Sequence, residues 1–136
     1  MAADRNRPGA QARSWRILLA EDEMLQARDT EGMLRDMGCS VVGIAGTAES
    51  AVELARTHHP DLVFMDIRLK GDRDGIEAAS QIRDCYGCRL VFVTAQSDEA
   101  ILIRARATHP AGFLFKPFGE DELLDLLLEM GRTASF

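Results

Sequence analysis

Polar side chains with complementary chemistry follow four apolar segments of this chain, each at the point where the segment ends. Glu21 and Asp22 follow the first segment, Asp66 ends a second, and Thr94 and Lys116 follow two later ones. A carboxylate at the end of a buried run is costly to desolvate, so its presence indicates that its charge is used. Three carboxylates, one hydroxyl and one ammonium are the groups that Mg²⁺ and a phosphoryl group would need.

Five strands alternating with five helices are predicted to position these groups. The strands are expected at residues 15–20, 40–45, 62–66, 90–93 and 112–115, and the helices at about 24–37, 48–59, 76–87, 98–108 and 120–130. This alternation is typical of an α/β protein with one doubly wound, five-stranded parallel sheet and helices on both faces. The carboxyl ends of parallel strands meet at one edge, where ligands bind, so the polar groups are expected to converge there. The strand order stays open.

Capping residues predict where two of the helices begin. Thr47 is the expected N-cap of the second helix, and Glu49 in the first turn complements the helix dipole. The capping box is expected to be incomplete, because Ser50 stands where Glu or Gln is usual. Ser97 or Asp98 is expected to cap the fourth helix.

Length and composition fit one globular domain with short tails. Of the 136 residues, 46% are hydrophobic, which is enough for one core. Residues 15–131 are expected to form the domain, residues 1–14 a disordered N-terminal tail and residues 132–136 a short C-terminal tail. The net charge of −6 argues against a nucleic-acid surface, and no apolar stretch is long enough to span a bilayer. Three cysteines without a secretion signal favour a cytoplasmic location.

The segments ILLAEDE (17–23), VFMDIRL (63–69), LVFVTAQ (90–96) and FLFKPF (113–118) carry these polar residues in a specific order and spacing. Together they resemble the receiver domains of two-component response regulators, in particular the stand-alone receivers of chemotaxis. The resemblance covers about residues 15–131 and implies a flavodoxin-like, CheY-like fold. It also implies a signalling switch that catalyses its own phosphorylation and dephosphorylation, rather than a metabolic enzyme.

The resemblance assigns a role to each carboxylate at the sheet edge. Asp66 is the implied phosphoacceptor, a nucleophile that takes a phosphoryl group from a histidine. Asp22 is the implied direct ligand of Mg²⁺ (or Mn²⁺), and Glu21 contributes directly or through water. Asp66 itself and the backbone carbonyl of Arg68 complete the protein ligands, a sparse set that suits a cation that keeps its waters.

The hydroxyl and the ammonium are implied to contact the phosphoryl group. Lys116 pairs with one phosphoryl oxygen and Thr94 donates a hydrogen bond to another. The peptide bond between Lys116 and Pro117 is commonly cis in this family, which aims the lysine into the site. Movement of Thr94 toward the phosphoryl group is expected to let Phe113 turn inward as the switch. A plain core phenylalanine is the alternative for Phe113.

The resemblance also implies the partners. A histidine kinase or a histidine phosphotransfer protein donates the phosphoryl group, and a downstream protein binds the fourth helix, the fifth strand and the last helix. Leu124 and Leu128 of the last helix are expected to be partly exposed, so a homodimer through this surface is a further hypothesis. With no output module expected beside the domain, its output is partner binding or relay of the phosphoryl group.

The loop after the acceptor departs from the commonest form of the family. That form has proline four residues after the acceptor, where this chain has Lys70, and the loop is one residue longer, with Gly71 adding freedom. We hypothesise that this loop alters kinase choice or phosphoryl lifetime; unchanged transfer and decay rates after restoring the common loop would count against it. Arg68 and Gln96 flank the approach of hydrolytic water and are candidates for tuning the dephosphorylation rate.

Rival interpretations of the same residues stay open. Glu21 and Asp22 could merely cap the helix that follows them. That interpretation does not account for the other polar residues, Asp66, Thr94 and Lys116. A scaffold that binds partners without phosphorylation would keep the fold and ignore the acid. A Mg²⁺-dependent aspartyl phosphohydrolase usually has a second acid two residues after the nucleophile, where this chain has arginine.

Cys85 and Cys88 form a CxxC motif that suits a redox pair or half of a zinc site. No second such motif exists in the sequence, and the three histidines lack a matching spacing. Incidental thiols are therefore the favoured interpretation.

Overall fold

The computed structural model describes residues 14–69, 74–95 and 98–133. The expectations for residues 1–13, for the loop residues Lys70 and Gly71, for Gln96 and Ser97, and for residues 134–136 lie outside this part of the chain.

The strands form one parallel sheet in the order β2-β1-β3-β4-β5. Their bounds are β1 (Arg16–Ala20), β2 (Ser40–Ala45), β3 (Leu62–Asp66), β4 (Arg89–Thr94) and β5 (Gly112–Phe115). The chain starts in β1, moves out to β2 and then returns past β1 to β3, so the order reverses between β1 and β3. In a doubly wound sheet the crevice at this reversal is where ligands bind. The predicted five-stranded parallel sheet is confirmed, and its strand order is now fixed.

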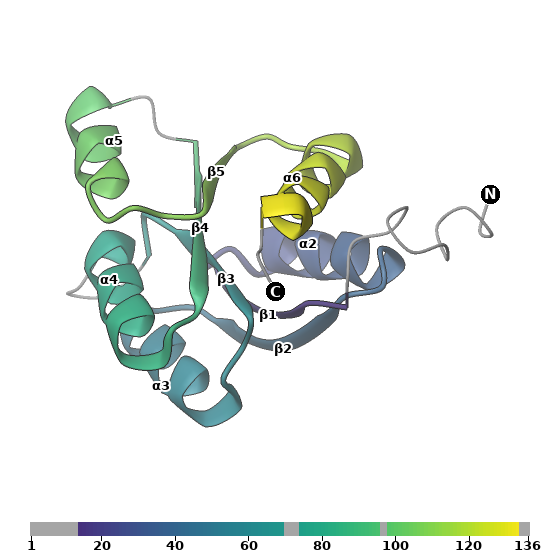
Figure 1. The fold of residues 1–136 in the computed structure, drawn as a ribbon, viewed down its shortest axis with the longest axis horizontal. Helices are drawn as coiled ribbons and strands as arrows, with labels where there is room; N and C mark the ends of the chain where they lie inside the picture. The colour runs from purple at the N-terminus through teal and green to yellow at the C-terminus, as the bar shows by residue number, and fades with distance from the viewer. Residues whose placement is uncertain (1–13, 70–73, 96–97, 134–136) are drawn as a thin grey trace.

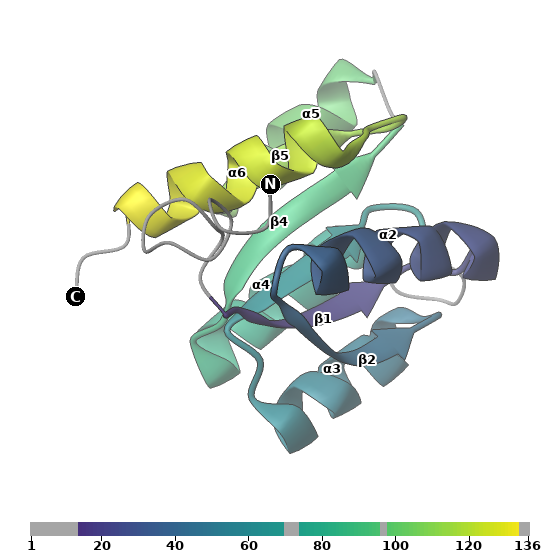
Figure 2. The ribbon, with the colours of Figure 1, turned by 90° about the vertical axis from the view of Figure 1, so that its right-hand side faces the viewer.

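Helices cover both faces of the sheet (Figures 1 and 2). On one face lie α2 (Met24–Asp36) and α6 (Glu120–Thr133), and on the other lie α3 (Ala48–His58), α4 (Gly75–Tyr86) and α5 (Glu99–Arg106). The last helix is longer than predicted, since residues expected to begin the C-terminal tail continue α6 to Thr133. Within the described ranges, every helix is too short or too polar to cross a membrane.

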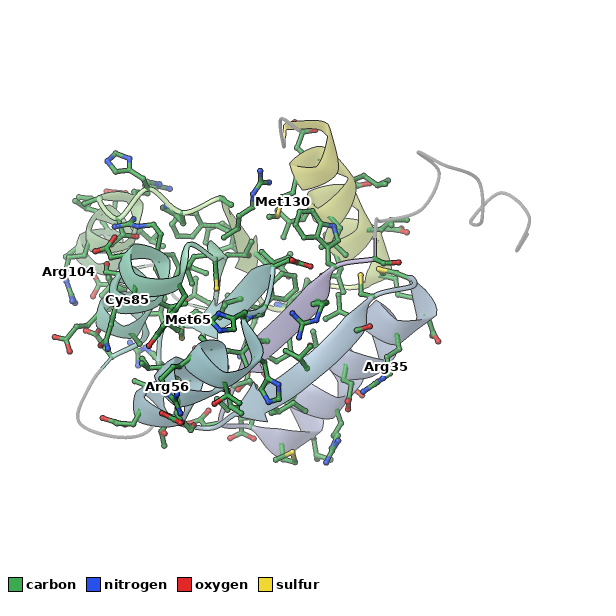
Figure 3. The ribbon with its side chains drawn as sticks, turned by 60° about the horizontal axis from the view of Figure 1, so that its bottom comes forward. Arg35, Arg56, Met65, Cys85, Arg104 and Met130 are labelled. Carbon is green, nitrogen blue, oxygen red and sulfur yellow. The ribbon has the colours of Figure 1, made fainter. Side chains whose placement is uncertain are left out.

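Two apolar cores hold these layers together. All five residues of β3 are buried, because the strand is central and covered on both faces. Val63, Met65 and Phe92 contribute to the core under α3, α4 and α5, while Phe64 and Leu127 contribute to the core under α2 and α6. Figure 3 shows Met65 inside the fold, with the labelled arginine side chains at its periphery. Continuous apolar strands thus leave polar groups only at the strand ends.

The start of α3 corrects one expectation. Thr47 is the N-cap as predicted, but the capping box is complete. The Thr47 hydroxyl accepts a hydrogen bond from the Ser50 amide at 3.1 Å, and the Ser50 hydroxyl accepts one from the Thr47 amide at 3.2 Å. The expectation that Glu or Gln is required was wrong, because the short serine side chain already reaches the N-cap amide. Asp98 caps α5, and its carboxylate accepts a hydrogen bond from the Ala100 amide at 2.9 Å.

Candidate functional site

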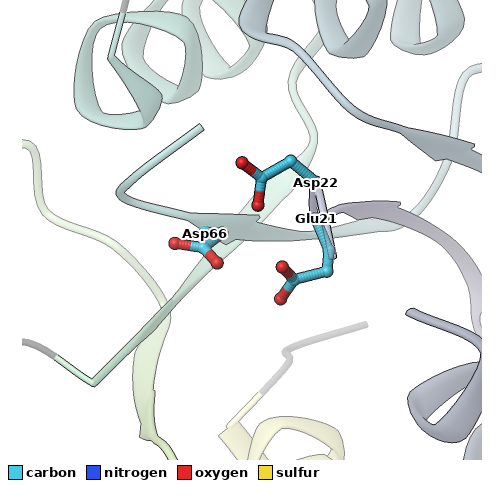
Figure 4. A group of neighbouring side chains, drawn as sticks. All are labelled: Glu21, Asp22 and Asp66. Carbon is cyan, nitrogen blue, oxygen red and sulfur yellow. The ribbon is translucent and has the colours of Figure 1, made fainter. Parts of the chain in front are cut away.

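Three carboxylates converge at the carboxyl edge of the sheet (Figure 4). Ala20 at the end of β1 lies beside Met65 of β3, so the residues that follow them in sequence meet at the same edge. Glu21, Asp22 and Asp66 each bring a carboxylate oxygen within 4.8 Å of the other two. The structure therefore brings the three predicted acids together at one edge of the sheet.

Backbone groups hold two of these carboxylates in position. Asp66 is only 7% exposed, and its Oδ1 accepts a hydrogen bond from the Arg68 amide at 2.8 Å. Glu21 is 9% exposed, and its Oε2 accepts a hydrogen bond from the Glu23 amide at 3.0 Å. Each acid is thus fixed by the loop that follows its own strand, which orients it before any ligand arrives.

Lys116 closes the site from the other side. Its peptide bond to Pro117 is cis, as the family resemblance implied. The Lys116 amide donates to the Thr94 carbonyl at 2.9 Å, and Nζ lies 2.6 Å from Glu21 Oε1 and 2.8 Å from Asp66 Oδ2. Burial alone would lower the pKa of Lys116, but hydrogen bonds and charge from Asp66 and Glu21 outweigh burial and raise that pKa above its ordinary value of 10.5. The ammonium is therefore held charged between two carboxylates.

Thr94 and Phe113 lie on neighbouring strands. Thr94 ends β4 and is 2% exposed; its partner in the β4–β5 pairing is Phe115. Phe113 is half-buried, and its ring centroid lies 5.7 Å from that of Phe92 and 6.0 Å from that of Phe115. The Arg106 guanidinium sits 5.7 Å from the Phe113 ring centroid. Thr94 therefore belongs to the site edge, while Phe113 lies deeper along β5, between the core and α5.

Gly75 is a positioning residue that the sequence interpretation did not identify. A Cβ at this position would lie 2.2 Å from the Asp66 carbonyl oxygen, far inside van der Waals contact. The Gly75 amide also donates to the Ile67 carbonyl at 3.1 Å. The start of α4 therefore packs directly on the backbone of the central acid, which only glycine permits. This contact is tertiary, so spacing in the sequence gave no signal for it.

An ion pair joins the acceptor loop to α5. Asp74, the N-cap of α4, accepts a hydrogen bond from the Glu77 amide at 2.9 Å and pairs with Arg104 at 3.0 Å. Figure 3 shows Arg104 at the edge of the molecule. Burial alone would raise the pKa of Asp74, but hydrogen bonds from Glu77 and Arg104, together with the Arg104 charge, outweigh it and lower that pKa below its ordinary value of 3.8.

The Arg104→Gln substitution is expected to reduce stability at neutral pH but not in acid. A carboxylate with a lowered folded-state pKa stabilises the fold above its unfolded pKa, and this contribution is lost as the pH falls through the folded value. Because both side chains are largely exposed, solvent screening limits the difference in unfolding free energy to about 0.2–1 kcal/mol at pH 7. Urea unfolding of wild type and variant between pH 7 and pH 3 measures this difference. A difference that stays constant over that range would contradict the assignment.

The chemistry of the carboxylate cluster fits a small, hard divalent cation. Mg²⁺ and Mn²⁺ prefer oxygen ligands, and Mg²⁺ in proteins commonly uses one or two carboxylates and keeps several waters. Three carboxylates so close together also repel one another, and a bound cation relieves that repulsion. Glu21, Asp22 and Asp66 therefore form a candidate metal centre.

The cysteines lie away from this centre and give little sign of reactivity. Cys85 is exposed near the end of α4, whereas Cys88 and Cys39 are buried. Burial raises the pKa of the Cys88 thiol, and the nearby Asp61 charge raises it further. A raised pKa disfavours the thiolate that redox and metal chemistry need. This supports the interpretation of the CxxC motif as incidental.

Comparisons with known proteins agree with this geometry. The family model described as "Response regulator receiver domain" matches residues 17–128. The transcriptional regulatory protein PdtaR of Mycobacterium tuberculosis is 44% identical over 109 residues, which cover 80% of this chain and 53% of PdtaR. The chemotaxis protein CheY of Bacillus subtilis is 31% identical over 113 residues, which cover 82% of this chain and 93% of CheY. This chain thus spans about half the length of PdtaR and most of CheY.

A solved structure shares the fold as well as the sequence pattern. The receiver domain of the response regulator NarL from Mycobacterium tuberculosis superimposes with a TM-score of 0.81 at 28% identity, covering 89% of this chain and 98% of that one. The parallel sheet, the acidic edge and the sequence matches lead to one conclusion. The chain belongs to the response regulator receiver domain family.

Proposed function

We propose that this domain is a phosphorylation-dependent switch whose acceptor is Asp66. The observation that carries the proposal is the setting of that carboxylate. It is 7% exposed, it shares an acidic cluster with Glu21 and Asp22, and it lies 2.8 Å from the Lys116 ammonium. The nucleophile Asp66, a candidate cation site and the Lys116 ammonium thus lie next to one another, as phosphoryl transfer requires.

The donor is a phosphohistidine of a kinase or phosphotransfer protein. A carboxylate oxygen of Asp66 attacks phosphorus, the phosphorus–nitrogen bond breaks, and its electron pair stays on the departing imidazole, which takes up a proton. Lys116 pairs with a phosphoryl oxygen, and Thr94 donates a hydrogen bond to another. When held by Glu21, Asp22, Asp66 and the Arg68 carbonyl, Mg²⁺ or Mn²⁺ supplies positive charge that offsets the negative phosphoryl oxygens.

Return to the resting state is hydrolysis of the acyl phosphate on Asp66. Water attacks phosphorus, the bond between phosphorus and the carboxylate oxygen breaks, and inorganic phosphate leaves. Arg68 and Gln96 are the proposed tuning residues for this step; the Arg68 side chain is exposed beside the acceptor. The domain is in this proposal a cytoplasmic signalling switch rather than a metabolic enzyme.

The proposed output surface consists of α5, β5 and α6. Ile103 is 62% exposed and Phe115 is 48% exposed, and Leu124 and Leu128 are half-buried. Apolar side chains on one surface favour contact with a protein partner. Thr94 and Phe113 connect the acceptor edge to this surface. The charge added by phosphorylation draws the Thr94 hydroxyl toward the phosphoryl group, and the Phe113 ring then turns inward. A downstream partner or a homodimer would use this surface, whereas relay of the phosphoryl group would take place at Asp66 itself.

Beryllofluoride with Mg²⁺ tests the switch, because it mimics a phosphoryl group on a carboxylate. In wild type, we expect backbone amide shifts in two-dimensional NMR at the acidic edge and along α5, β5 and α6. In Asp66→Asn, which keeps the shape but lacks the charge, we expect none of these shifts. Shifts confined to the acidic edge of wild type would contradict the switch while leaving the acceptor chemistry intact.

The phosphohydrolase interpretation has less support than the switch. It needs a second acid two residues after Asp66, where Arg68 offers only its amide to Asp66 and a cationic side chain. We therefore expect no turnover of free phosphoesters such as p-nitrophenyl phosphate. Turnover that disappears in Asp66→Asn would reverse this preference.

A further inference from the structure

A cavity of about 330 Å³ opens beside the acidic edge, on the face of the sheet that α2 and α6 cover. Leu19, Phe64 and Val93, from three adjacent strands, form its floor. Met33 of α2 and Phe118, in the loop between β5 and α6, line its walls. The cavity is therefore apolar inside and lies against the central strands.

The packing of the two helices explains why this space is open. On this face, helix α2 packs on β1 and β2, whereas α6 packs on β5 at the other end of the strand order, so the two helices lie apart (Figure 2). The side of α2 that faces the cavity carries the small residue Ala27, which is 1% exposed. The strands between the helices are thus covered incompletely. A volume of this size lies at the lower end of the range for small-molecule sites.

The rim of the cavity is polar and predominantly acidic. Gln26, Asp29 and Thr30, on successive turns of α2, line it on one side. Glu21 and Lys116 line its end nearest the acidic cluster, but the Lys116 ammonium already pairs with Glu21 and with Asp66. The Lys116 charge is therefore already paired with two carboxylates and does not favour an anionic ligand.

Asp29 places a negative charge in the lining of the cavity. Within the part of the chain that the structure describes, its carboxylate forms no hydrogen bond or ion pair. An anion entering the cavity would meet Asp29 and Glu21 without a spare cation. An ammonium group would find Asp29 as its counter-charge, with the Thr30 hydroxyl and the Gln26 amide available as acceptors.

We propose that this cavity is a binding site for a small aromatic amine. The ring packs on Phe64, Met33 and Phe118, and the ammonium group pairs with Asp29 at the rim. Glu21 lines the cavity and belongs to the acidic cluster, and Lys116 lines the cavity and pairs with that cluster, so the ligand and Mg²⁺ each change the affinity of the other by the same factor. This coupling rests on the proposed metal centre; the binding site itself does not.

Three probes that share one ring system but differ in charge test the proposal: tryptamine, indole and indole-3-acetate. Each is titrated into labelled wild-type protein in EDTA, with backbone amide shifts as the readout. Tryptamine is expected to shift the amides of α2 and of the loop at residues 116–119, with a Kd of about 1 mM, as befits so small a ligand. Indole is expected to bind more weakly at the same amides, and indole-3-acetate more weakly still. Equal affinities for all three probes, or shifts elsewhere, would overturn the proposal.

Two variants locate the binding site, and a third serves as the control. Asp29→Asn is expected to weaken tryptamine about threefold and to leave indole unchanged, since an exposed charge pair contributes little more. Thr30→Leu fills the cavity and is expected to abolish binding of both. Asp125→Asn removes an exposed carboxylate from α6 that does not line the cavity, and it is expected to match wild type. Unchanged tryptamine binding in a folded Thr30→Leu protein would exclude this cavity as the site. All these titrations omit metal and phosphate, so failure of the proposed phosphorylation leaves them interpretable.

Discussion

The Lys116→Met substitution is expected to slow phosphoryl transfer to Asp66 by about 10²–10³-fold, the usual effect of removing one charge-stabilising donor from an active site. The Nζ atom lies 2.8 Å from Asp66 Oδ2, so the ammonium already stands beside the carboxylate that would receive the phosphoryl group. Methionine retains most of the apolar stem and removes only the ammonium. The variant should therefore still fold, and the largest effect should appear in the rate of transfer.

The time course of phosphorylation by acetyl phosphate, followed by intact mass, measures this rate. Arg35→Met is the control, because it also removes one cation, but from an exposed pair with Glu31 on α2. In metal-free buffer Lys116→Met should also lower the unfolding free energy by about 1–3 kcal/mol, since two nearly buried carboxylates lose a hydrogen-bond donor. A variant that is phosphorylated as fast as wild type would remove Lys116 from the proposed mechanism.

Gly75→Ala is expected to be the most destabilising small substitution near the site, lowering the unfolding free energy by more than about 3 kcal/mol. The added methyl carbon would lie 2.2 Å from the Asp66 carbonyl oxygen, and both groups belong to the backbone frame, so no side-chain rotation relieves the overlap. Either α4 moves away from β3 or Asp66 moves out of the acidic cluster. We expect both movements to reduce phosphorylation as well.

Urea unfolding of Gly75→Ala beside Gly32→Ala gives a matched comparison. Gly32 lies within α2, and a Cβ there meets nothing within 4 Å. Alanine at position 32 should therefore stabilise the protein by up to about 1 kcal/mol, because alanine has the higher helix propensity. Wild-type stability of Gly75→Ala would show that the start of α4 does not depend on this close packing.

The sequence was sufficient to predict which residues gather at the sheet edge. Glu21, Asp22, Asp66, Thr94 and Lys116 each follow an apolar run, and parallel strands bring such positions together whatever the strand order. The pairing of Lys116 with both carboxylates before any ligand binds was not predicted, because it depends on side-chain geometry across three segments. The order of the strands was open for a similar reason, since alternation of elements fixes the class of fold but not its winding.

Contacts between distant segments account for most of what the sequence did not reveal. The approach of Gly75 to the Asp66 carbonyl, the pairing of Asp74 with Arg104 and the cavity under α2 each depend on how helices pack on the sheet. The Ser50 capping interaction is local, and it was missed because the usual pattern favours a longer side chain. Local patterns thus predicted the elements and the acidic edge, while tertiary packing determined the detailed geometry of the site.

The most direct test of the central claim is the intact mass of wild type and Asp66→Asn after incubation with acetyl phosphate, with Mg²⁺ and with EDTA. Asp66 as phosphoacceptor predicts an acid-labile phosphoryl adduct on wild type with Mg²⁺ only, and no adduct on Asp66→Asn under any condition. A phosphohistidine donor protein replaces acetyl phosphate in a parallel sample, so that a receiver that accepts phosphate only from a protein partner is also detected. An adduct of equal size on folded Asp66→Asn, or none on wild type with either donor, would contradict the claim and favour a scaffold that works without phosphorylation.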